Sequence, residues 1–439
     1  MITERENEIL TRVGPATPMG RMMRRYWLPV CTSAQLPRPD APPLRLSVLG
    51  ESFVAFRDTA GRVGVLDEFC MHRRSSLVLG RVEDHGIRCL YHGWKFAVDG
   101  TIQETPNHCD DRFRARLRAP AYPAREAGGL VWAYLGPKEL EPPFQTYEFF
   151  AGPDANRCVF RINVPANYLQ LYEGGTDSSH VGILHCNLAN PEWKNKASFV
   201  PQQDDYTSVA LAVGDNAPLI DIENTPYGFH YAAKRQGPVL ADGTDTFSVR
   251  VTAVIFPTGR VIPLPQYQFF VFEVPQDDLK TSTYVIAHGA KPFDRDKMRA
   301  VLGLDNGTLW NERDCEYLAT PENRFGQDLG RMHETWSGLA GLVPEDASIG
   351  VSMGPIVERH KEVLVAADAA VVRLRVRLLE SLRLHEAGEA PLGLGIRDYS
   401  RVRSLADTPV AKTGRWQDLV PGNSGSSPAP ARDQAAVPA

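Results

Sequence analysis

Two short segments contain residues with the types and spacing of metal ligands. Cys70 and His72 form a Cys-x-His pair, and Cys89 and His92 form a Cys-x-x-His pair further along the chain. Two thiolates and two imidazoles bind either a structural zinc ion or a 2Fe-2S cluster in which two His replace two Cys on one iron. Zinc fingers usually pair Cys with Cys and His with His, whereas each segment here carries one of each. We therefore expect the cluster, which transfers electrons.

The residues that follow each histidine support this interpretation. The first His is followed by Arg-Arg and the second by Gly-Trp. The stretches CMHRR and CLYHGWKF resemble the Rieske motif of bacterial ring-hydroxylating oxygenases. The resemblance implies that a Rieske 2Fe-2S cluster is bound by Cys70, His72, Cys89 and His92.

A second candidate metal site lies in residues 167–185, NYLQLYEGGTDSSHVGILH. His180 and His185 could supply the imidazoles of the two-His, one-carboxylate site of non-haem Fe(II) oxygenases. In a regular helix, residues five apart project about 140° from one another. The spacing therefore predicts that the helix ends or distorts near Gly182. Asp177 precedes His180 by one helical turn and could accept its outer ring N–H. The alternative is a polar helix end with two satisfied histidines.

This segment closely resembles the mononuclear-iron motif of the Rieske non-haem iron oxygenases, in particular the phthalate-dioxygenase-like α subunits. The resemblance extends from TRVGPATPMGRMMRRYW to SMGPIVERHKEVL. It implies that His180 and His185 bind mononuclear Fe(II). It also implies catalytic roles for Asn167 and for Asp177, which would link His180 to His92 of a neighbouring subunit.

The carboxylate ligand is expected in the stretch VPEDASIGVSMGPI. The resemblance favours Asp346, and its neighbour Glu345 is the main rival. Gly350 and Val351 depart from the polar pair that the resemblance leads us to expect there.

Hydrophobic patterning predicts an α+β protein with several domains. We expect an N-terminal helical segment at 1–42, with a short amphipathic helix over 2–12, and an all-β Rieske domain at 43–141. A catalytic domain at 142–420 combines helices with an antiparallel sheet, and the resemblance implies the helix-grip fold. A long helix over 368–386 closes it, with arginines on a solvated or intersubunit face. Residues 421–439 have the composition of a disordered tail.

Composition excludes several classes of partner. The chain has 439 residues and a net charge of −5, so no basic excess favours nucleic acid or an anionic membrane. Since no apolar run approaches the ~20 residues of a transmembrane helix, and the start MITERENEIL is polar, we expect a cytoplasmic protein.

The resemblance implies a terminal oxygenase that forms homotrimers or hexamers. It would take electrons from NADH through a separate reductase, because the chain has no GxGxxG loop of its own. With O2 it would cis-dihydroxylate an aromatic carboxylate such as phthalate or a substituted benzoate. A carboxylate needs a cation in the pocket, and the candidates for substrate binding are Arg250, Ser178 and Lys234. The alternatives are a Rieske monooxygenase or O-demethylase, and an electron-transfer or redox-sensing protein.

Overall fold

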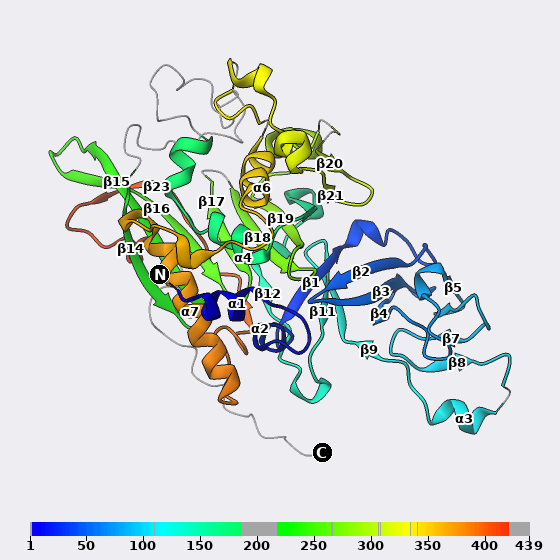
Figure 1. The fold of residues 1–439 in the computed structure, drawn as a ribbon. Coiled ribbons are helices and arrows are strands. Elements are labelled where there is room, and N and C mark those ends of the chain that lie inside the picture. The colour runs from blue at the N-terminus through cyan, green and yellow to red at the C-terminus, as the bar shows by residue number, and fades with distance from the viewer. Residues whose placement is uncertain are drawn as a thin grey trace.

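The computed structural model describes residues 2–108, 110–185, 217–264, 267–305, 307, 309–333, 335–339 and 341–420. An all-β region and a larger α+β region lie side by side in an elongated molecule (Figure 1). The predicted fold class is therefore confirmed. The tail predicted at 421–439 lies outside the described residues.

The chain begins with two short helices, α1 (Glu4–Thr11) and α2 (Pro18–Met23), the first of which was predicted. Thr3 caps α1, because its hydroxyl accepts from the Glu6 backbone while the Glu6 carboxylate accepts from Thr3. The next strand, β1 (Trp27–Thr32), pairs with β11 (Leu130–Tyr134). The first strand of the all-β region therefore precedes the boundary that we predicted at residue 43.

The all-β region contains three small sheets, in the orders β1-β11-β10, β2-β3-β4-β9 and β5-β6-β7-β8. The loop from β4 to β5 carries Cys70 and His72, and the loop from β6 to β7 carries Cys89 and His92. A short helix α3 (Asp111–Ala115) lies at its far end (Figure 1). The remaining strands are β2 (Leu44–Val48), β3 (Glu51–Arg57), β4 (Val63–Asp67), β5 (Arg81–Glu83), β6 (Gly86–Arg88), β7 (Lys95–Phe96), β8 (Ile102–Glu104), β9 (Ala121–Tyr122) and β10 (Ala124–Ala127).

The α+β region is built on a ten-stranded sheet with the order β14-β15-β16-β17-β18-β19-β13-β21-β20, with β23 also paired to β16. Its long central strands pair antiparallel, as predicted. The strands are β13 (Arg157–Val164), β14 (Leu219–Thr225), β15 (Gly228–Val239), β16 (Asp245–Ile255), β17 (Gly259–Pro263), β18 (Tyr267–Pro275), β19 (Thr281–Gly289), β20 (Trp310–Asn311), β21 (Glu316–Tyr317) and β23 (Leu405–Ala411). A separate parallel pair joins β12 (Thr146–Tyr147) to β22 (Asp398–Tyr399).

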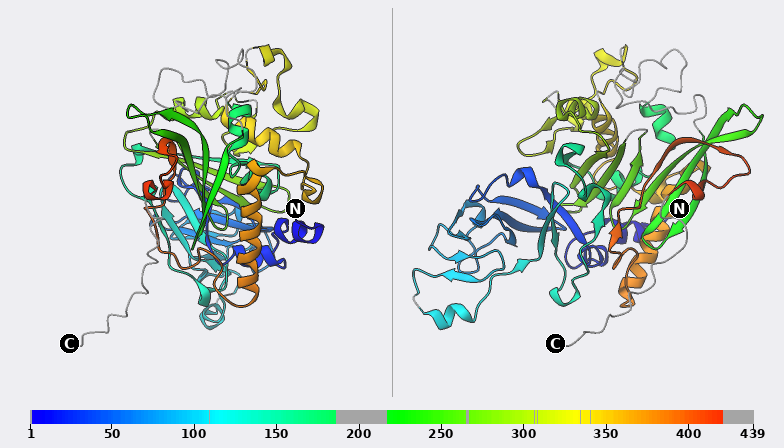
Figure 2. Two further views of the ribbon diagram at one scale, coloured as in Figure 1. Left: turned by 90° about the vertical axis from the view of Figure 1, so that its left-hand side faces the viewer. Right: turned by 180° about the vertical axis from the view of Figure 1, so that it is seen from behind.

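The sheet separates two hydrophobic cores. Helix α7 (Ala369–Glu386) buries Leu374, Leu378 and Leu382 in one core, and it lies along the sheet in Figure 2. On the other side, α5 (Arg295–Leu302) and α6 (Leu342–Ser352) pack into the second core. Helix α4 (Tyr168–Gly174) contributes side chains to both cores. The candidate iron ligands therefore lie on the α6 side of the sheet.

The long helix predicted over 368–386 is present, but the expectation for its arginines was wrong in two cases. Arg375 is buried and pairs with Glu173 at 2.6 Å. Arg377 is buried and donates to the Thr225 carbonyl at 2.9 Å. Both arginines therefore tie α7 to the α+β region instead of facing solvent.

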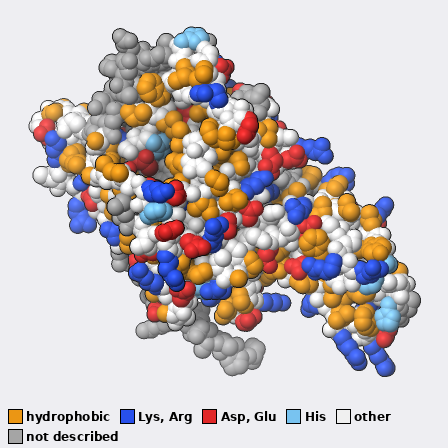
Figure 3. All heavy atoms as spheres, viewed as in Figure 1, with side chains coloured by type: hydrophobic (Ala, Val, Ile, Leu, Met, Phe, Trp, Pro, Cys, Tyr) orange, Lys and Arg blue, Asp and Glu red, His pale blue; other side chains and the backbone are white. Residues whose placement is uncertain are grey.

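The surface shows charges of both signs. Figure 3 shows Lys and Arg side chains interspersed with Asp and Glu over the visible face. Within the described ranges, no helix combines the length and hydropathy needed to cross a bilayer.

Candidate metal centres and cavity

The two Cys/His loops bring their four side chains together at the far end of the all-β region. Cys70 and Cys89 are both buried, and the rings of His72 and His92 lie 4.6 Å apart between centroids. Each cysteine closes its own loop, because the Cys70 amide donates to Ser75 and the Cys89 amide donates to Trp94. The two imidazole rings, one from each loop, therefore lie next to each other, and each loop also contributes one buried thiol.

These loops fit a 2Fe-2S cluster of the Rieske type. Both thiols are free, and the buried Nδ1 of His92 has no hydrogen-bond partner among the described residues. An unpartnered buried ring nitrogen is unfavourable unless it binds a metal or another group. Trp94 stacks on His72 at 4.8 Å with an interplanar angle of 3°, and its indole N–H donates to Asn107. The stacked indole fixes the orientation of the His72 ring.

The second site depends on a local change of helix type. After α4 ends, residues Val181–His185 form a π-helical turn, labelled η6. Because a π-helix closes its hydrogen bonds between residues five apart, it brings His180 and His185 to the same side. Their ring centroids are 5.1 Å apart. The predicted distortion near Gly182 is confirmed. It allows two histidines that are five residues apart to face the same point, which a regular helix would not.

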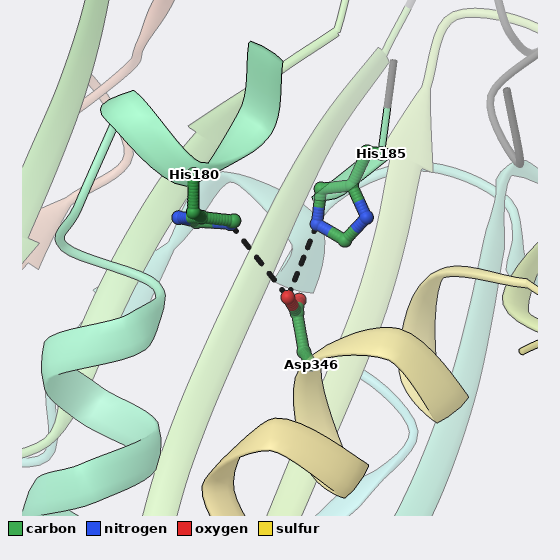
Figure 4. Close-up of side chains that lie close together, drawn as sticks. All are labelled: His180, His185 and Asp346. Carbon is green, nitrogen blue, oxygen red and sulfur yellow. Dashed lines mark ion pairs between the residues drawn. The ribbon is translucent and has the colours of Figure 1, made fainter. Parts of the chain in front are cut away.

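Asp346 on α6 completes a group of three possible ligands (Figure 4). Its Oδ1 lies 3.6 Å from Nε2 of His180 and 3.1 Å from Nε2 of His185. The three ligand atoms all lie within 4.8 Å of one another. Both imidazoles therefore turn the same nitrogen towards the carboxylate, which leaves Nδ1 of each ring for a second partner.

Each of these second partners is a carboxylate. Oδ2 of Asp177 lies 3.2 Å from Nδ1 of His180, as expected from the sequence. Oε2 of Glu345 lies 2.7 Å from Nδ1 of His185, and its other oxygen accepts from the Ser337 hydroxyl at 2.7 Å. Such bonds fix the tautomer and orientation of a metal-binding histidine. Glu345, the other candidate for the ligand position, thus bonds to the ring nitrogen of His185 that faces away from Asp346.

The electrostatics of this group favour a cation. Burial lowers the pKa of His185, but Asp346 and Glu345 outweigh that effect and raise it to about 10. Burial raises the pKa of Asp177, yet its bond to His180 outweighs this and the pKa falls to about 2. Carboxylates on both sides of the imidazoles create a point of negative potential between the three ligand atoms. A divalent cation there would replace the proton that His185 otherwise holds.

A cavity with about 950 Å³ of empty space, part of which is open solvent at its mouth, lies beside His180 and Asp346. Asp177, His180 and Asp346 contribute to its wall. Most of the described lining is apolar and comes from the sheet, α4 and α6, including Ile162, Val164, Leu171, Ile262, Phe269, Val271, Val285, Leu342, Val343, Ile349 and Met353. The polar lining includes Arg260, Glu273 and Thr283, none of which the sequence analysis identified.

Comparison with known proteins identifies the family. Residues 26–121 match the model of the Rieske [2Fe-2S] domain, and residues 133–430 match the model described as LigXa C-terminal domain like. The chain belongs to the Rieske non-haem iron oxygenases. The cofactors of this oxygenase are a Rieske 2Fe-2S cluster and a mononuclear iron.

Similar proteins span nearly the whole oxygenase. It is 37% identical to the phthalate 4,5-dioxygenase oxygenase subunit of Pseudomonas putida, over 95% of this chain and 94% of that protein. It is 46% identical to the tert-butanol monooxygenase / tert-amyl alcohol desaturase oxygenase subunit of Aquincola tertiaricarbonis, over 88% of this chain and 77% of that protein. The terminal oxygenase of carbazole 1,9a-dioxygenase from Nocardioides aromaticivorans IC177 has the same fold, with a TM-score of 0.56, 15% identity and coverage of 86% and 97%.

The structure does not support the catalytic role predicted for Asn167 of the oxygenase. Asn167 is buried and caps α4, since its side-chain oxygen accepts from the Leu169 amide. Its side-chain nitrogen donates to the carbonyls of Thr11 and Asp278. Asn167 therefore holds the start of α4 against the N-terminal segment and is not part of the described cavity wall.

The three predicted substrate-binding residues lie outside the described lining of the cavity. Arg250 faces Asp407, with 3.7 Å between the charged groups, and both side chains are buried. Lys234 pairs with Asp221 at 3.2 Å beside a different cavity. Ser178 is buried, and its carbonyl accepts from Arg235 at 2.8 Å. Their role in substrate binding stays a prediction, for which this geometry gives no support.

Proposed function

We propose that this Rieske oxygenase is the terminal component of a multicomponent system and hydroxylates a small organic substrate in the cavity beside His180, His185 and Asp346. The observation that carries the proposal is that His180 and Asp346 lie in the wall of a largely apolar cavity and form one group of possible ligands with His185. A site of this composition leaves metal positions open, and the bound iron supplies the activation of O2. The apolar wall orients the substrate and keeps water away from it.

The proposed cofactor ligands are those that the geometry brings together. Cys70, His72, Cys89 and His92 hold the 2Fe-2S cluster, and His180, His185 and Asp346 hold Fe(II). The mixed thiol and imidazole loops support the first set. The common orientation of the two Nε2 atoms towards Asp346 supports the second.

Electrons come from a separate NADH-dependent reductase in this proposal. The relatives from Pseudomonas putida and Aquincola tertiaricarbonis are both named as oxygenase subunits, which supports a division of labour between components. The chain itself has no GxGxxG stretch for a dinucleotide.

An oligomer would bring the two metal centres of different subunits together. The cluster loops lie at the far end of the all-β region from α4 and α6 (Figure 1). We propose that Asp177, bonded to His180, also contacts His92 of a neighbouring subunit and so links the two centres. Head-to-tail contacts of this kind close into a ring, such as a trimer or a pair of stacked trimers.

Two reactions fit the site. The first is cis-dihydroxylation of an aromatic ring, which the similarity to a phthalate dioxygenase supports. The second is the insertion of one oxygen atom, which the similarity to a tert-butanol monooxygenase supports. An aromatic carboxylate was expected as substrate, and the phthalate relative favours it, but the described cavity wall does not contain the cations predicted to bind it.

The test is a substrate screen with NADH, a surrogate reductase and isotopically labelled O2. Mass spectrometry of the product distinguishes the two reactions, because dihydroxylation places both labelled atoms in the ring and monooxygenation places one. Consumption of O2 in step with product formation supports the proposal. A protein that is reduced and reoxidised without oxygenating any substrate would be an electron-transfer or redox-sensing protein instead.

A further inference from the structure

Arg260 lies in the cavity wall as part of a row of polar side chains across three strands. Arg260 on β17 is opposite Val271 on β18, and Glu273 lies two residues further along β18 on the same face. Thr283 on β19 is directly opposite Glu273. The three side chains therefore project from the same face of the sheet, among the apolar residues of the cavity.

This row forms a buried and electrically neutral unit. Nη2 of Arg260 donates to Oε1 of Glu273 at 2.8 Å, and the side chains are only 8% and 2% exposed. The other oxygen of Glu273 accepts from the Thr283 hydroxyl. Since both oxygens of the carboxylate are engaged, its position is fixed, and it neutralises the guanidinium beside it.

The guanidinium group of Arg260 also has unused hydrogen-bond donors. Nε and Nη1 of Arg260 are buried and have no hydrogen-bond partner among the described residues. The guanidinium also packs so closely on Gly175 that a Cβ at that position would overlap it. Glycine at the end of α4 thus permits an approach that any other residue would block. The side chain is held in place with unused N–H groups inside the cavity wall.

We propose that Arg260 is a specificity-determining residue that selects an uncharged substrate with an oxygen acceptor, such as a hydroxyl, carbonyl or ether. The inference rests on the proposed function, because it assigns the substrate class of that same cavity. Buried donors without partners are unfavourable, and an acceptor oxygen of the substrate would satisfy them. The apolar remainder of the substrate would pack on the surrounding aliphatic and aromatic side chains.

A carboxylate would satisfy the same donors but add a negative charge, and the described lining contains no cation besides Arg260 to compensate it. Glu273 already balances Arg260, and Asp177, Glu345 and Asp346 surround the metal position with three further carboxylates. With a divalent cation bound, the charges of Arg260, the four carboxylates and the cation sum to −1. A carboxylate in a cavity of low dielectric constant would increase that excess and be repelled. A neutral acceptor avoids this repulsion.

The test compares three ligands with the same ring: toluene, benzyl alcohol and benzoate. Binding to the iron-loaded holoenzyme with an oxidised cluster is measured by calorimetry without O2 or reductant. We expect benzyl alcohol to bind about 10- to 100-fold more tightly than toluene, because it satisfies donors of a charged group, and benzoate to bind most weakly. Tightest binding by benzoate, equal binding of toluene and benzyl alcohol, or no binding of any of the three would overturn the inference.

Variants of the pair test the charge argument directly. Glu273→Gln preserves the shape of the side chain but leaves Arg260 as an uncompensated cation, so benzoate should become the tightest of the three ligands. The double variant Arg260→Met with Glu273→Leu replaces the buried pair by apolar side chains, a change that proteins often tolerate. It should bind toluene and benzyl alcohol equally. An unchanged ranking in either folded variant would overturn the inference.

A matched control makes the same kind of change outside the cavity. Glu316→Gln breaks an ion pair with Lys280, whose charged groups lie 2.6 Å apart, in the same sheet but away from the described lining. It should leave the ranking of the three ligands unchanged. Because binding is measured without turnover, a failed ranking is distinct from a failure of the proposed function, which appears only as the absence of oxygenated product with reductase and O2.

Discussion

Replacing Glu345 should weaken iron binding without abolishing it, because Glu345 bonds to His185 and is not one of the proposed iron ligands. The bond between its carboxylate and Nδ1 of His185 is 2.7 Å long and fully buried. A hydrogen bond to a charged group contributes about 1.5–3 kcal/mol, against about 0.5–1.5 kcal/mol for a neutral one. In Glu345→Gln the charge is lost and the shape kept, so the cost should be about 1.5 kcal/mol, or about tenfold in Fe(II) affinity.

The assay is an anaerobic titration of the iron-depleted protein with Fe(II) against a chromophoric chelator. The absorbance of the Rieske cluster serves as an internal control for folding. Ser337→Ala leaves the bond between Glu345 and His185 in place but removes the hydroxyl that bonds to the far oxygen of Glu345 and to the Leu339 amide, so it should cost less, about 1 kcal/mol or about fivefold. Asp346→Ala removes a proposed ligand and should cost far more than either. The expected order of affinity is wild type, Ser337→Ala, Glu345→Gln and then Asp346→Ala.

This order separates the two neighbouring carboxylates. If Glu345→Gln lost iron completely while Asp346→Ala bound it with wild-type affinity, Glu345 would be the ligand and the reasoning from the side-chain geometry would be refuted. Equal losses in both variants would show that the two carboxylates share the metal.

Four further predictions follow from particular contacts. His180→Ala should keep the cluster spectrum and abolish oxygenation, because the two sites lie in separate regions; loss of both signals would contradict this. Asp177→Asn should retain both irons but slow reoxidation of the reduced cluster by about 10- to 100-fold in a single-turnover experiment. Gly175→Ala should displace the guanidinium of Arg260 and raise the KM for substrate at unchanged iron content. Burial lowers the pKa of His230 to about 3, so His230 stays neutral in the folded protein. In the unfolded chain its pKa is about 6.5, so protonation favours unfolding and the stability of the fold decreases as pH falls below that value. Between pH 7 and 5 the loss should be about 2 kcal/mol, and His230→Gln should reduce it in denaturant titrations at the two pH values.

The sequence predicts those parts of the site that depend on neighbours in the chain. The cluster loops are recognisable because each Cys/His pair lies within one short loop, where spacing alone sets the geometry. The distortion of the helix near Gly182 could be predicted for the same reason. His180 and His185 cannot bind one metal from a regular helix, and the π-helical turn resolves that conflict locally.

The choice between Glu345 and Asp346 depends on how α6 is rotated against the rest of the protein. Successive residues of a helix project about 100° apart, so at most one of them faces the metal directly. Sequence reasoning treated the other residue as a rival. The structure shows why both are acidic, since Glu345 reaches the ring of His185 from behind while Asp346 faces both Nε2 atoms.

The substrate residues were harder to predict because alternation along a strand does not reveal which face borders a cavity. Arg250 interrupts an apolar strand and must have a partner, but that partner is Asp407, more than a hundred residues away. Arg260 lies in a strand of only five residues, GRVIP, where no alternation is visible. Its significance appears only when β18 and β19 place Glu273 and Thr283 beside it.

The charged side chains of the site have two different roles, one beside the proposed metal position and one in the cavity wall. The carboxylates of Asp177 and Glu345 each bond to the outer nitrogen of an imidazole, so their charge would act on the iron through its proposed ligands. The charge of Arg260 is instead cancelled within the cavity wall by Glu273. An enzyme selecting an anionic substrate would have reason to leave that guanidinium unpaired, because a bidentate bond to a carboxylate is among the strongest contacts a protein can offer. Pairing it with a buried glutamate removes this advantage and leaves only directional N–H donors. The arrangement therefore favours substrates that are recognised by hydrogen-bond geometry over substrates that are recognised by charge. Glu273→Gln should reverse this preference.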